Sequence, residues 1–103
     1  MSDVVSVNSK QEFDELLASE NEVVLKFWAT WCGPCRQFAP HFETLAEKSE
    51  AKFVEVDVDA VPDLAVEYGV QGIPNVKLFK AGEYVTDLKG RTVISLQKEI
   101  AEN

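Results

Sequence analysis

The chain contains two cysteines, and they stand close together in the segment Cys32-Gly33-Pro34-Cys35. Two thiols at this spacing suit thiol–disulfide exchange, in which a thiolate attacks a substrate disulfide and a second thiol then releases the product from the mixed disulfide. We therefore assign the nucleophilic role to Cys32 and the resolving role to Cys35, as the catalytic residues of a dithiol oxidoreductase.

The position of the motif favours a reactive first sulfur. An alternating apolar pattern over residues 22–29 precedes it, and a helical pattern begins at Pro34, a residue suited to the first helical turn. Cys32 should therefore lie at the amino terminus of a helix, where unpaired N–H groups and the positive end of the helix dipole stabilise a thiolate. This placement lowers a thiol pKa below the value of about 8.5 for free cysteine.

Other uses of the two cysteines are weaker. A structural disulfide that closes so short a loop stabilises a fold by only about 2 kcal/mol. A zinc site needs four ligands, and the one other soft candidate is His41, on the same expected helix, so we expect no metal and take His41 as a surface residue. The main alternative is a binding module in which the redox chemistry is incidental.

Composition sets the broad class. The 103 residues are 46% hydrophobic and 27% charged, which suits a single globular domain over residues 1–103. A net charge of −8 disfavours nucleic acid and anionic membranes as partners, and no stretch is long and apolar enough to span a membrane. The first six residues lack a secretory pattern, and the two cysteines of one short motif make no secreted disulfide framework. We expect a cytoplasmic monomer.

Hydrophobic periodicity predicts the elements that position the motif. Strands are expected at residues 4–7, 22–29, 53–58, 75–80 and 84–88, and helices after Ser9, from Pro34 through Ala46, at residues 62–68 and over residues 93–100. This is the order βαβαβαββα, with parallel crossovers first and an antiparallel hairpin last. The pattern predicts an α/β fold with a single mixed sheet flanked by helices on both faces.

The segment from Phe27 to Cys35, Phe-Trp-Ala-Thr-Trp-Cys-Gly-Pro-Cys, closely resembles the active-site signature of the thioredoxin family. Gly33-Pro34 between the cysteines is typical of its reducing members. Ala39-Pro40, Asp57-Val58-Asp59 and Gly72-Ile73-Pro74 match the family pattern too, and the resemblance runs over residues 4–100. It implies the thioredoxin fold and a protein-disulfide reductase that works as a dithiol electron carrier without a bound cofactor. It also implies recycling by a thioredoxin reductase and disulfide-containing protein substrates such as peroxiredoxins.

The same resemblance implies roles for residues around the cysteines. Pro74 should follow a cis peptide bond that turns the Ile73 backbone toward the sulfurs, where a substrate segment can pair as an added strand. Trp28 should pack beneath the active-site loop. The positions that match the family's substrate-docking surface are Trp31, Gly33, Pro34, Ile73, Pro74 and Gly90.

Two residues depart from the family pattern. Lys26 stands where the family usually has a buried Asp, and an unpaired buried ammonium is costly, so it needs a partner. We expect Glu55 beside it, taking over some of the proton handling for Cys35. The alternative is that Lys26 extends to solvent along its aliphatic stem and that Cys35 exchanges its proton with water. Arg91 replaces a small or apolar residue, and either favours acidic substrates or lies solvated at the surface.

Overall fold

The computed structural model describes residues 3–103, so Met1 and Ser2, at the start of the expected domain, lie outside the described residues. The five strands are β1 (Val4–Ser6), β2 (Glu22–Trp28), β3 (Lys52–Asp57), β4 (Asn75–Lys80) and β5 (Glu83–Leu88). The four helices are α1 (Lys10–Ser19), α2 (Gly33–Lys48), α3 (Pro62–Glu67) and α4 (Val93–Ala101). Their order along the chain is the predicted βαβαβαββα.

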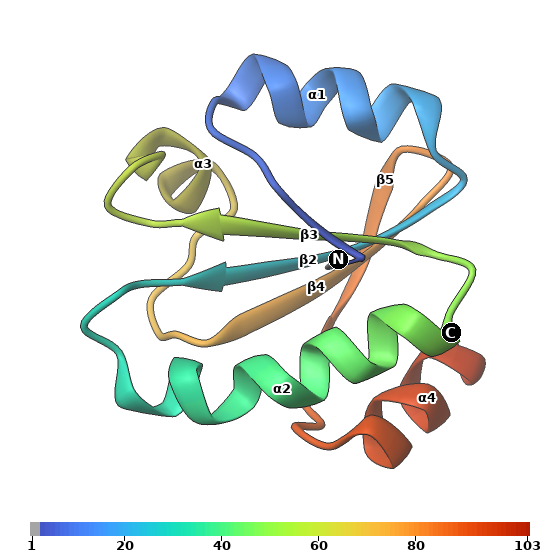
Figure 1. The fold of residues 1–103 in the computed structure, drawn as a ribbon. Helices are drawn as coiled ribbons and strands as arrows, with labels where there is room; N and C mark the ends of the chain where they lie inside the picture. Colours follow the sequence, from blue (N-terminus) through green and yellow to red (C-terminus); the bar gives the residue numbers. More distant parts are fainter. Residues whose placement is uncertain (1–2) are drawn as a thin grey trace.

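The strands form one mixed sheet in the order β1-β3-β2-β4-β5. β1, β3 and β2 run parallel, whereas β4 is antiparallel to β2 and β5 is antiparallel to β4. Helices α1 and α3 lie on one side of the sheet and α2 and α4 on the other (Figure 1). The predicted mixed sheet with helices on both faces is thus confirmed.

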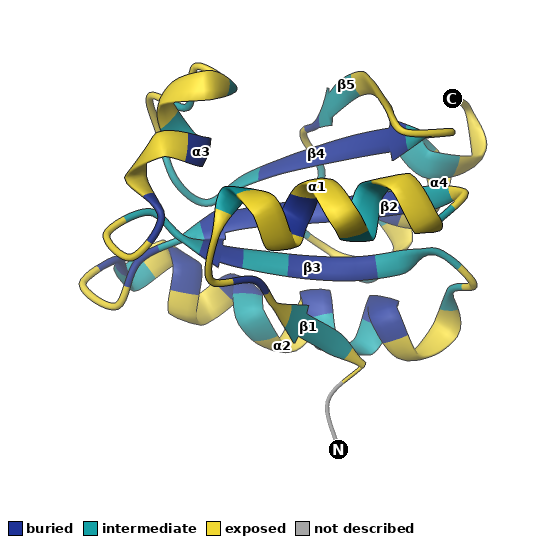
Figure 2. Ribbon diagram, turned by 90° about the horizontal axis from the view of Figure 1, so that it is seen from above, coloured by how far each residue is buried: buried dark blue, intermediate teal, exposed yellow. Residues whose placement is uncertain are grey.

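The alternation along β2 builds a core on each face of the sheet, because successive strand residues point to opposite sides. Val23, Leu25 and Phe27 pack into the cluster under α1 and α3, and Val24 packs into the cluster under α2 and α4. Figure 2 shows the result as buried central strands covered by helices whose outer faces are exposed. The central strand is therefore packed on both faces from Val23 to Phe27, next to its end at Trp28.

The strand directions bring three loops to one end of the sheet. Because β4 is antiparallel to its neighbours, its amino end lies beside the carboxyl ends of β2 and β5. The loops at these ends carry Cys32, Ile73 and Gly90. Residues separated by more than fifty positions are in this way placed around one site.

Candidate active site

The two cysteines begin helix α2 and form a disulfide, with their Cα atoms 5.2 Å apart. Cys32 is the N-cap residue, and the backbone N–H of Cys35 donates a hydrogen bond of 3.1 Å to the Cys32 sulfur. Both residues are buried, Cys32 at 5% exposure and Cys35 at 2%. The structure therefore shows the oxidised form, with the first sulfur held by a helix-terminal donor.

The disulfide is part of a small apolar cluster. Ala29 and the two cysteines pack together, and Trp28, Val58 and Ile73 lie against them. Trp28 thus contacts the cluster that contains the disulfide.

The loop before β4 meets the disulfide from the side. The Ile73–Pro74 peptide bond is cis, which confirms the geometry implied by the resemblance. The carbonyl oxygen of Ile73 lies 3.8 Å from the Cys32 sulfur. The backbone of this loop therefore lies directly beside the Cys32 sulfur.

Trp31 lies at the surface beside the cysteines, with 66% of the residue exposed. Its indole N–H donates a hydrogen bond of 2.8 Å to the Asp59 carboxylate, in the loop after β3. Arg36 donates from Nη1 to the carbonyl of Thr30, also at 2.8 Å. Both bonds restrain the loop that leads into the dithiol.

Comparison with known proteins agrees with this geometry. A family model described as Thioredoxin matches residues 4–102. The chain belongs to the thioredoxin family. It is 38% identical to Thioredoxin-1 of Schizosaccharomyces pombe over 101 residues, which cover 97% of this chain and 98% of that protein. It is 42% identical to the thioredoxin of Ovis aries over 102 residues, which cover 96% and 97%.

A solved structure extends the likeness to three dimensions. It comes from work on the thiol resolving mechanism in yeast mitochondrial 1-Cys peroxiredoxin via glutathione/thioredoxin systems, and it matches with a TM-score of 0.89 at 31% identity over 100% of both chains. Thioredoxin-family proteins are thiol–disulfide oxidoreductases, and the Cys32–Cys35 pair supplies the dithiol that this reaction needs. The protein is accordingly a dithiol–disulfide reductase.

Lys26 and Glu55 lie opposite each other on β2 and β3. Lys26 Nζ is 3.7 Å from Glu55 Oε1, and the two side chains are 5% and 21% exposed. The ammonium also lies 4.9 Å from the centre of the Phe42 ring on α2. Lys26 is thus enclosed under α2, and the alternative that it extends to solvent is wrong.

Electrostatics at Lys26 reflect this enclosure. Burial lowers the pKa of Lys26, since desolvation disfavours the charged amine, and the nearby carboxylates of Glu55 and Glu43 offset only part of that effect. Glu55 has a second partner, because Ser6 Oγ on β1 donates to its Oε2 at 3.0 Å. Ser6, Glu55 and Lys26 therefore form a polar row across three neighbouring strands.

Gly90 packs against the last helix. A Cβ at this position would lie 2.9 Å from both Ser95 Cβ and Glu99 Oε1 on α4. The Glu99 carboxylate accepts hydrogen bonds from the backbone N–H groups of Lys89 and Gly90, at 2.9 and 2.5 Å. Close packing against α4 therefore favours glycine at position 90, in addition to the expected close approach of a substrate chain.

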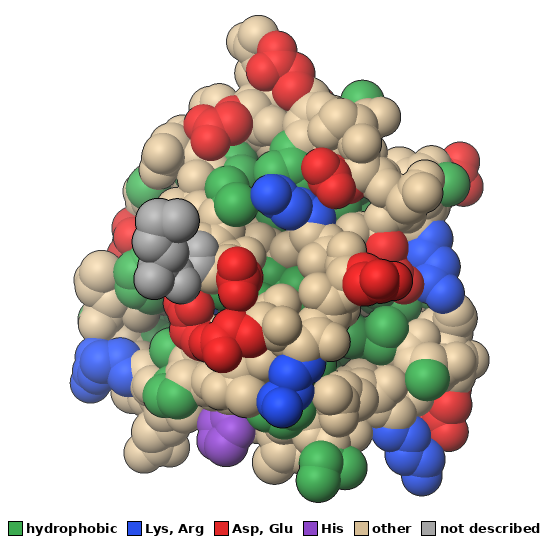
Figure 3. Space-filling view, turned by 45° about the vertical axis from the view of Figure 1, so that its right-hand side comes forward, with side chains coloured by type: hydrophobic (Ala, Val, Ile, Leu, Met, Phe, Trp, Pro, Cys, Tyr) green, Lys and Arg blue, Asp and Glu red, His purple; other side chains and the backbone are tan. Residues whose placement is uncertain are grey.

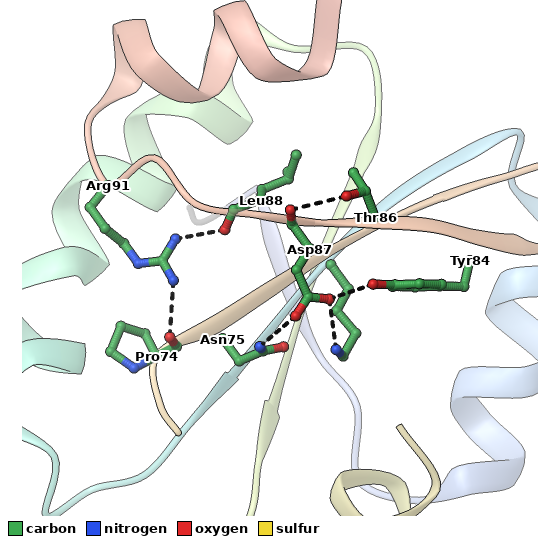
Figure 4. Close-up of polar contacts among 8 residues, drawn as sticks. Pro74, Asn75, Tyr84, Thr86, Asp87, Leu88 and Arg91 are labelled. Atoms are coloured by element: carbon green, nitrogen blue, oxygen red, sulfur yellow. Dashed lines mark hydrogen bonds and ion pairs between the residues drawn. The ribbon is translucent and has the colours of Figure 1, made fainter. Parts of the chain in front are cut away.

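Arg91 makes contacts that the sequence did not indicate. Its Nη1 donates to the Leu88 carbonyl at 2.9 Å, and its Nη2 donates to the Pro74 carbonyl at 3.1 Å (Figure 4). Nη1 also donates to the Gly90 carbonyl at 2.7 Å. The loop after β5 is thereby tied to the loop before β4. The expectation of a solvated surface arginine is wrong, because Arg91 is half-buried and bonded to the backbone.

A polar cluster on the hairpin was also missed. Asp87 accepts from Lys77 Nζ and the Tyr84 hydroxyl at 2.8 Å and from Asn75 Nδ2 at 3.1 Å (Figure 4). Burial acts to raise the pKa of Asp87, but these hydrogen bonds outweigh it and hold the pKa below its ordinary value. The cluster fastens β4 to β5 just beyond Pro74.

One face of the molecule shows how its surface charges are distributed. The face in Figure 3 carries Asp and Glu in several separate groups, interspersed with Lys and Arg. Within residues 3–103, no three His, Cys, Asp or Glu side chains gather closely enough to hold a metal ion. Over the same residues, no helix has the length and hydropathy needed to cross a membrane.

Proposed function

We propose that Cys32 is the attacking thiol of this disulfide reductase and Cys35 the resolving thiol. One observation carries the assignment: Cys32 caps α2 and its sulfur accepts the Cys35 N–H at 3.1 Å. In the reduced protein this donor and the helix dipole favour negative charge on Cys32. Cys35 lies inside the first turn and is the more buried of the two.

The reaction then has two exchange steps. The Cys32 thiolate attacks one sulfur of a substrate disulfide, forming a mixed disulfide and expelling the other substrate sulfur as a thiolate, which takes a proton from solvent. Cys35, after losing its proton, attacks the Cys32 sulfur, re-forms the Cys32–Cys35 disulfide and expels the second substrate thiolate. Two electrons pass from the protein dithiol to the substrate disulfide.

Substrates should dock across the loops around the disulfide. The Ile73 backbone offers the edge for an extended segment, and its carbonyl lies 3.8 Å from the Cys32 sulfur. The family resemblance implies that further docking residues surround this edge: Trp31, Gly33, Pro34, Pro74 and Gly90. The exposed Trp31 supplies apolar contact area on one side.

Lys26 and Glu55 complete the proposed mechanism by serving the proton exchange of Cys35. Both lie on the face of the sheet that α2 covers, and Trp28, two residues after Lys26 on that face, packs against the cysteines. Phe42, which contacts the ammonium, follows Cys35 by about two helical turns. The exchange therefore requires intervening water, with Glu55 as the acceptor.

The partners follow from the same chemistry. After each turnover the oxidised protein needs a dithiol donor, and we propose a thioredoxin reductase in that role. Disulfides in proteins such as peroxiredoxins are the proposed substrates; a solved chain that matches this one comes from work on a peroxiredoxin and the glutathione/thioredoxin systems. We propose that residues 1–103 act as one domain, as a monomer and in the cytoplasm, apart from nucleic acid and membranes.

Reduction of insulin disulfides with dithiothreitol as the electron source tests this function. The wild-type protein should accelerate the precipitation of the freed insulin chain, and Cys32→Ser should abolish the acceleration. Trp31→Phe, which keeps the dithiol, should retain most of it. Equal rates for the wild type and Cys32→Ser would instead favour the binding module with incidental redox chemistry.

A further inference from the structure

A groove lies beside the disulfide, between α2 and the loop that joins β5 to α4. Its volume is about 330 Å³, and it is lined by Pro34, Gln37, Phe38, His41, Pro74 and Arg91. Pro34 separates the two cysteines and Pro74 follows Ile73, so the groove continues directly from the site where a substrate would exchange its disulfide. A substrate residue near the reacting cysteine is within reach of it.

Arg91 is the cation of this groove, and its position is fixed before any substrate arrives. Its three hydrogen bonds go to the carbonyls of Leu88, Gly90 and Pro74, and its guanidinium carbon lies 5.3 Å from the centre of the Phe38 ring. These bonds use three of the five N–H donors of an arginine, leaving Nε–H and one Nη2–H outside them. Little side-chain entropy would be lost when an anion binds.

The charge of Arg91 is not neutralised by these bonds. Carbonyl oxygens carry no net charge, and the carboxylates of Glu99 and Asp87 act on Arg91 only as electrostatic neighbours. Partial burial lowers the pKa of Arg91, since desolvation disfavours its charged form, yet arginine remains a cation in proteins. A carboxylate in the groove would compensate that desolvation with a charge-assisted hydrogen bond.

We propose that this groove is a subsite for an Asp or Glu side chain of the substrate, close in sequence to the reacting cysteine, with Arg91 as the residue that recognises it. The inference rests on the proposed disulfide exchange at Cys32. Phe38 and the two prolines would contact the methylene groups of the acidic side chain, and the guanidinium its carboxylate.

The chain carries a net charge of −8, whereas the proposed subsite carries the positive charge of Arg91. Long-range steering by an acidic protein favours basic substrates, and it repels acidic ones. A preference for an acidic residue beside the reacting cysteine would therefore have to come from a short-range contact. The two effects predict opposite orders of reactivity, which makes them separable.

Three peptides with the same internal disulfide test the proposal, differing only in whether Glu, Gln or Lys flanks the first cysteine. Pre-reduced protein is mixed with each peptide at low ionic strength, and the second-order rate constant of disulfide loss is measured. The subsite predicts the order Glu, Gln, Lys, with Glu at least about threefold faster than Gln. Long-range steering alone predicts the reverse order, and that result would overturn the proposal.

Two arginine variants localise the effect. Arg91→Gln should bring the Glu-to-Gln rate ratio close to one; any slowing caused by the loss of the loop contacts affects both peptides and cancels in the ratio. Arg36→Gln, which removes a cation beside the dithiol that does not line the groove, should keep the wild-type ratio. A ratio unchanged in Arg91→Gln would also overturn the proposal.

The wild-type measurements keep the test independent of how the variants fold. Raising the ionic strength to about 0.1 M, where the Debye length is about 10 Å, screens long-range steering more than the direct contact with Arg91, so the order Glu, Gln, Lys should persist. Equal rates for all three peptides would reject the subsite but leave disulfide exchange intact. Failure of the reduced wild type to react with any peptide would instead reject the proposed function.

Discussion

Lys26 Nζ lies 3.7 Å from Glu55 Oε1, across the parallel pair β2 and β3, at the face of the sheet covered by the helix that begins at the dithiol. The pair is asymmetric, because Lys26 is almost fully enclosed while Glu55 keeps some contact with solvent and a second bond to Ser6. The charge of the buried ammonium is incompletely compensated, because burial lowers the pKa of Lys26 despite the nearby carboxylates of Glu55 and Glu43. This relationship leads to predictions about stability, its pH dependence and proton exchange.

The first prediction concerns stability. Lys26→Met removes the desolvation cost of the ammonium and should leave the free energy of unfolding unchanged or raise it by about 1 kcal/mol. Glu55→Gln removes the carboxylate that pairs with the ammonium across the two strands and should lower that free energy by about 1 kcal/mol. Chemical denaturation at neutral pH measures both. A strong loss of stability in Lys26→Met would contradict this account of the pair.

The same residue sets a pH dependence. The pKa of Lys26 in the folded protein is lowered from its ordinary value of 10.5, so between the lowered value and 10.5 the unfolded chain binds more protons at this position. The contribution of Lys26 to the free energy of unfolding therefore rises with pH through that window. Unfolding curves on the alkaline side should show this rise in the wild type and a smaller one in Lys26→Met.

The second prediction concerns proton exchange at Cys35. If Glu55 accepts that proton, Glu55→Gln should shift the pH profile of disulfide reduction and lower the rate by about tenfold or more on its plateau. Lys26→Met should shift the profile too, because it removes the charge beside Glu55. Ser6→Ala, which removes only the second partner of Glu55, is the matched control and should shift it least. Profiles that overlay the wild type would remove both residues from the mechanism.

The third prediction concerns the two thiols in the reduced protein. Cys32, at the helix cap, should be alkylated by iodoacetamide faster than Cys35, and the difference should be largest just below neutral pH, where only an acidic thiol is ionised. Mass spectrometry of peptides after brief labelling gives both rates. Faster labelling of Cys35 would reverse the assignment of nucleophile and resolver.

The fourth prediction concerns Gly90. Gly90→Ala places a Cβ 2.9 Å from Ser95 Cβ and Glu99 Oε1, so it should lower the free energy of unfolding by about 1–3 kcal/mol. Gly72→Ala is the control in the loop before β4, where a Cβ meets nothing within 4 Å, and it should change stability by less than about 0.5 kcal/mol. Thermal unfolding compares the two. Equal changes in the free energy of unfolding would show that Ser95 and Glu99 on α4 move aside at little cost.

Much of the fold follows from periodicity. β4 has the predicted bounds Asn75–Lys80, and the alternation of residues 22–29 places Val24 and Lys26 on the same face, as expected. This periodicity is visible in the local sequence. Successive strand residues point to opposite faces of the sheet, so residues on one face recur every two positions. The sheet order is a matter of tertiary packing, and the periodicity did not determine it.

Polar contacts around the site were harder to foresee. The bonds of Arg91 and Glu99 to backbone groups depend on the path of two loops, and Arg91 reaches a carbonyl 17 positions away in sequence. No residue pattern encodes such a contact. The capping box of Thr92 and Ser95 at the start of α4 could have been found, because both are residues that favour helix caps.

The central claim is that Cys32 attacks and Cys35 resolves. Mixing each reduced single-cysteine variant with a disulfide-containing protein substrate, followed by intact-mass measurement under non-reducing conditions, tests it most directly. Cys35→Ser should accumulate a mixed disulfide joining Cys32 to the substrate, and Cys32→Ser should form at most traces of an adduct in the same time. Accumulation on Cys35 in the Cys32→Ser variant, with little on Cys32 in Cys35→Ser, would contradict the account.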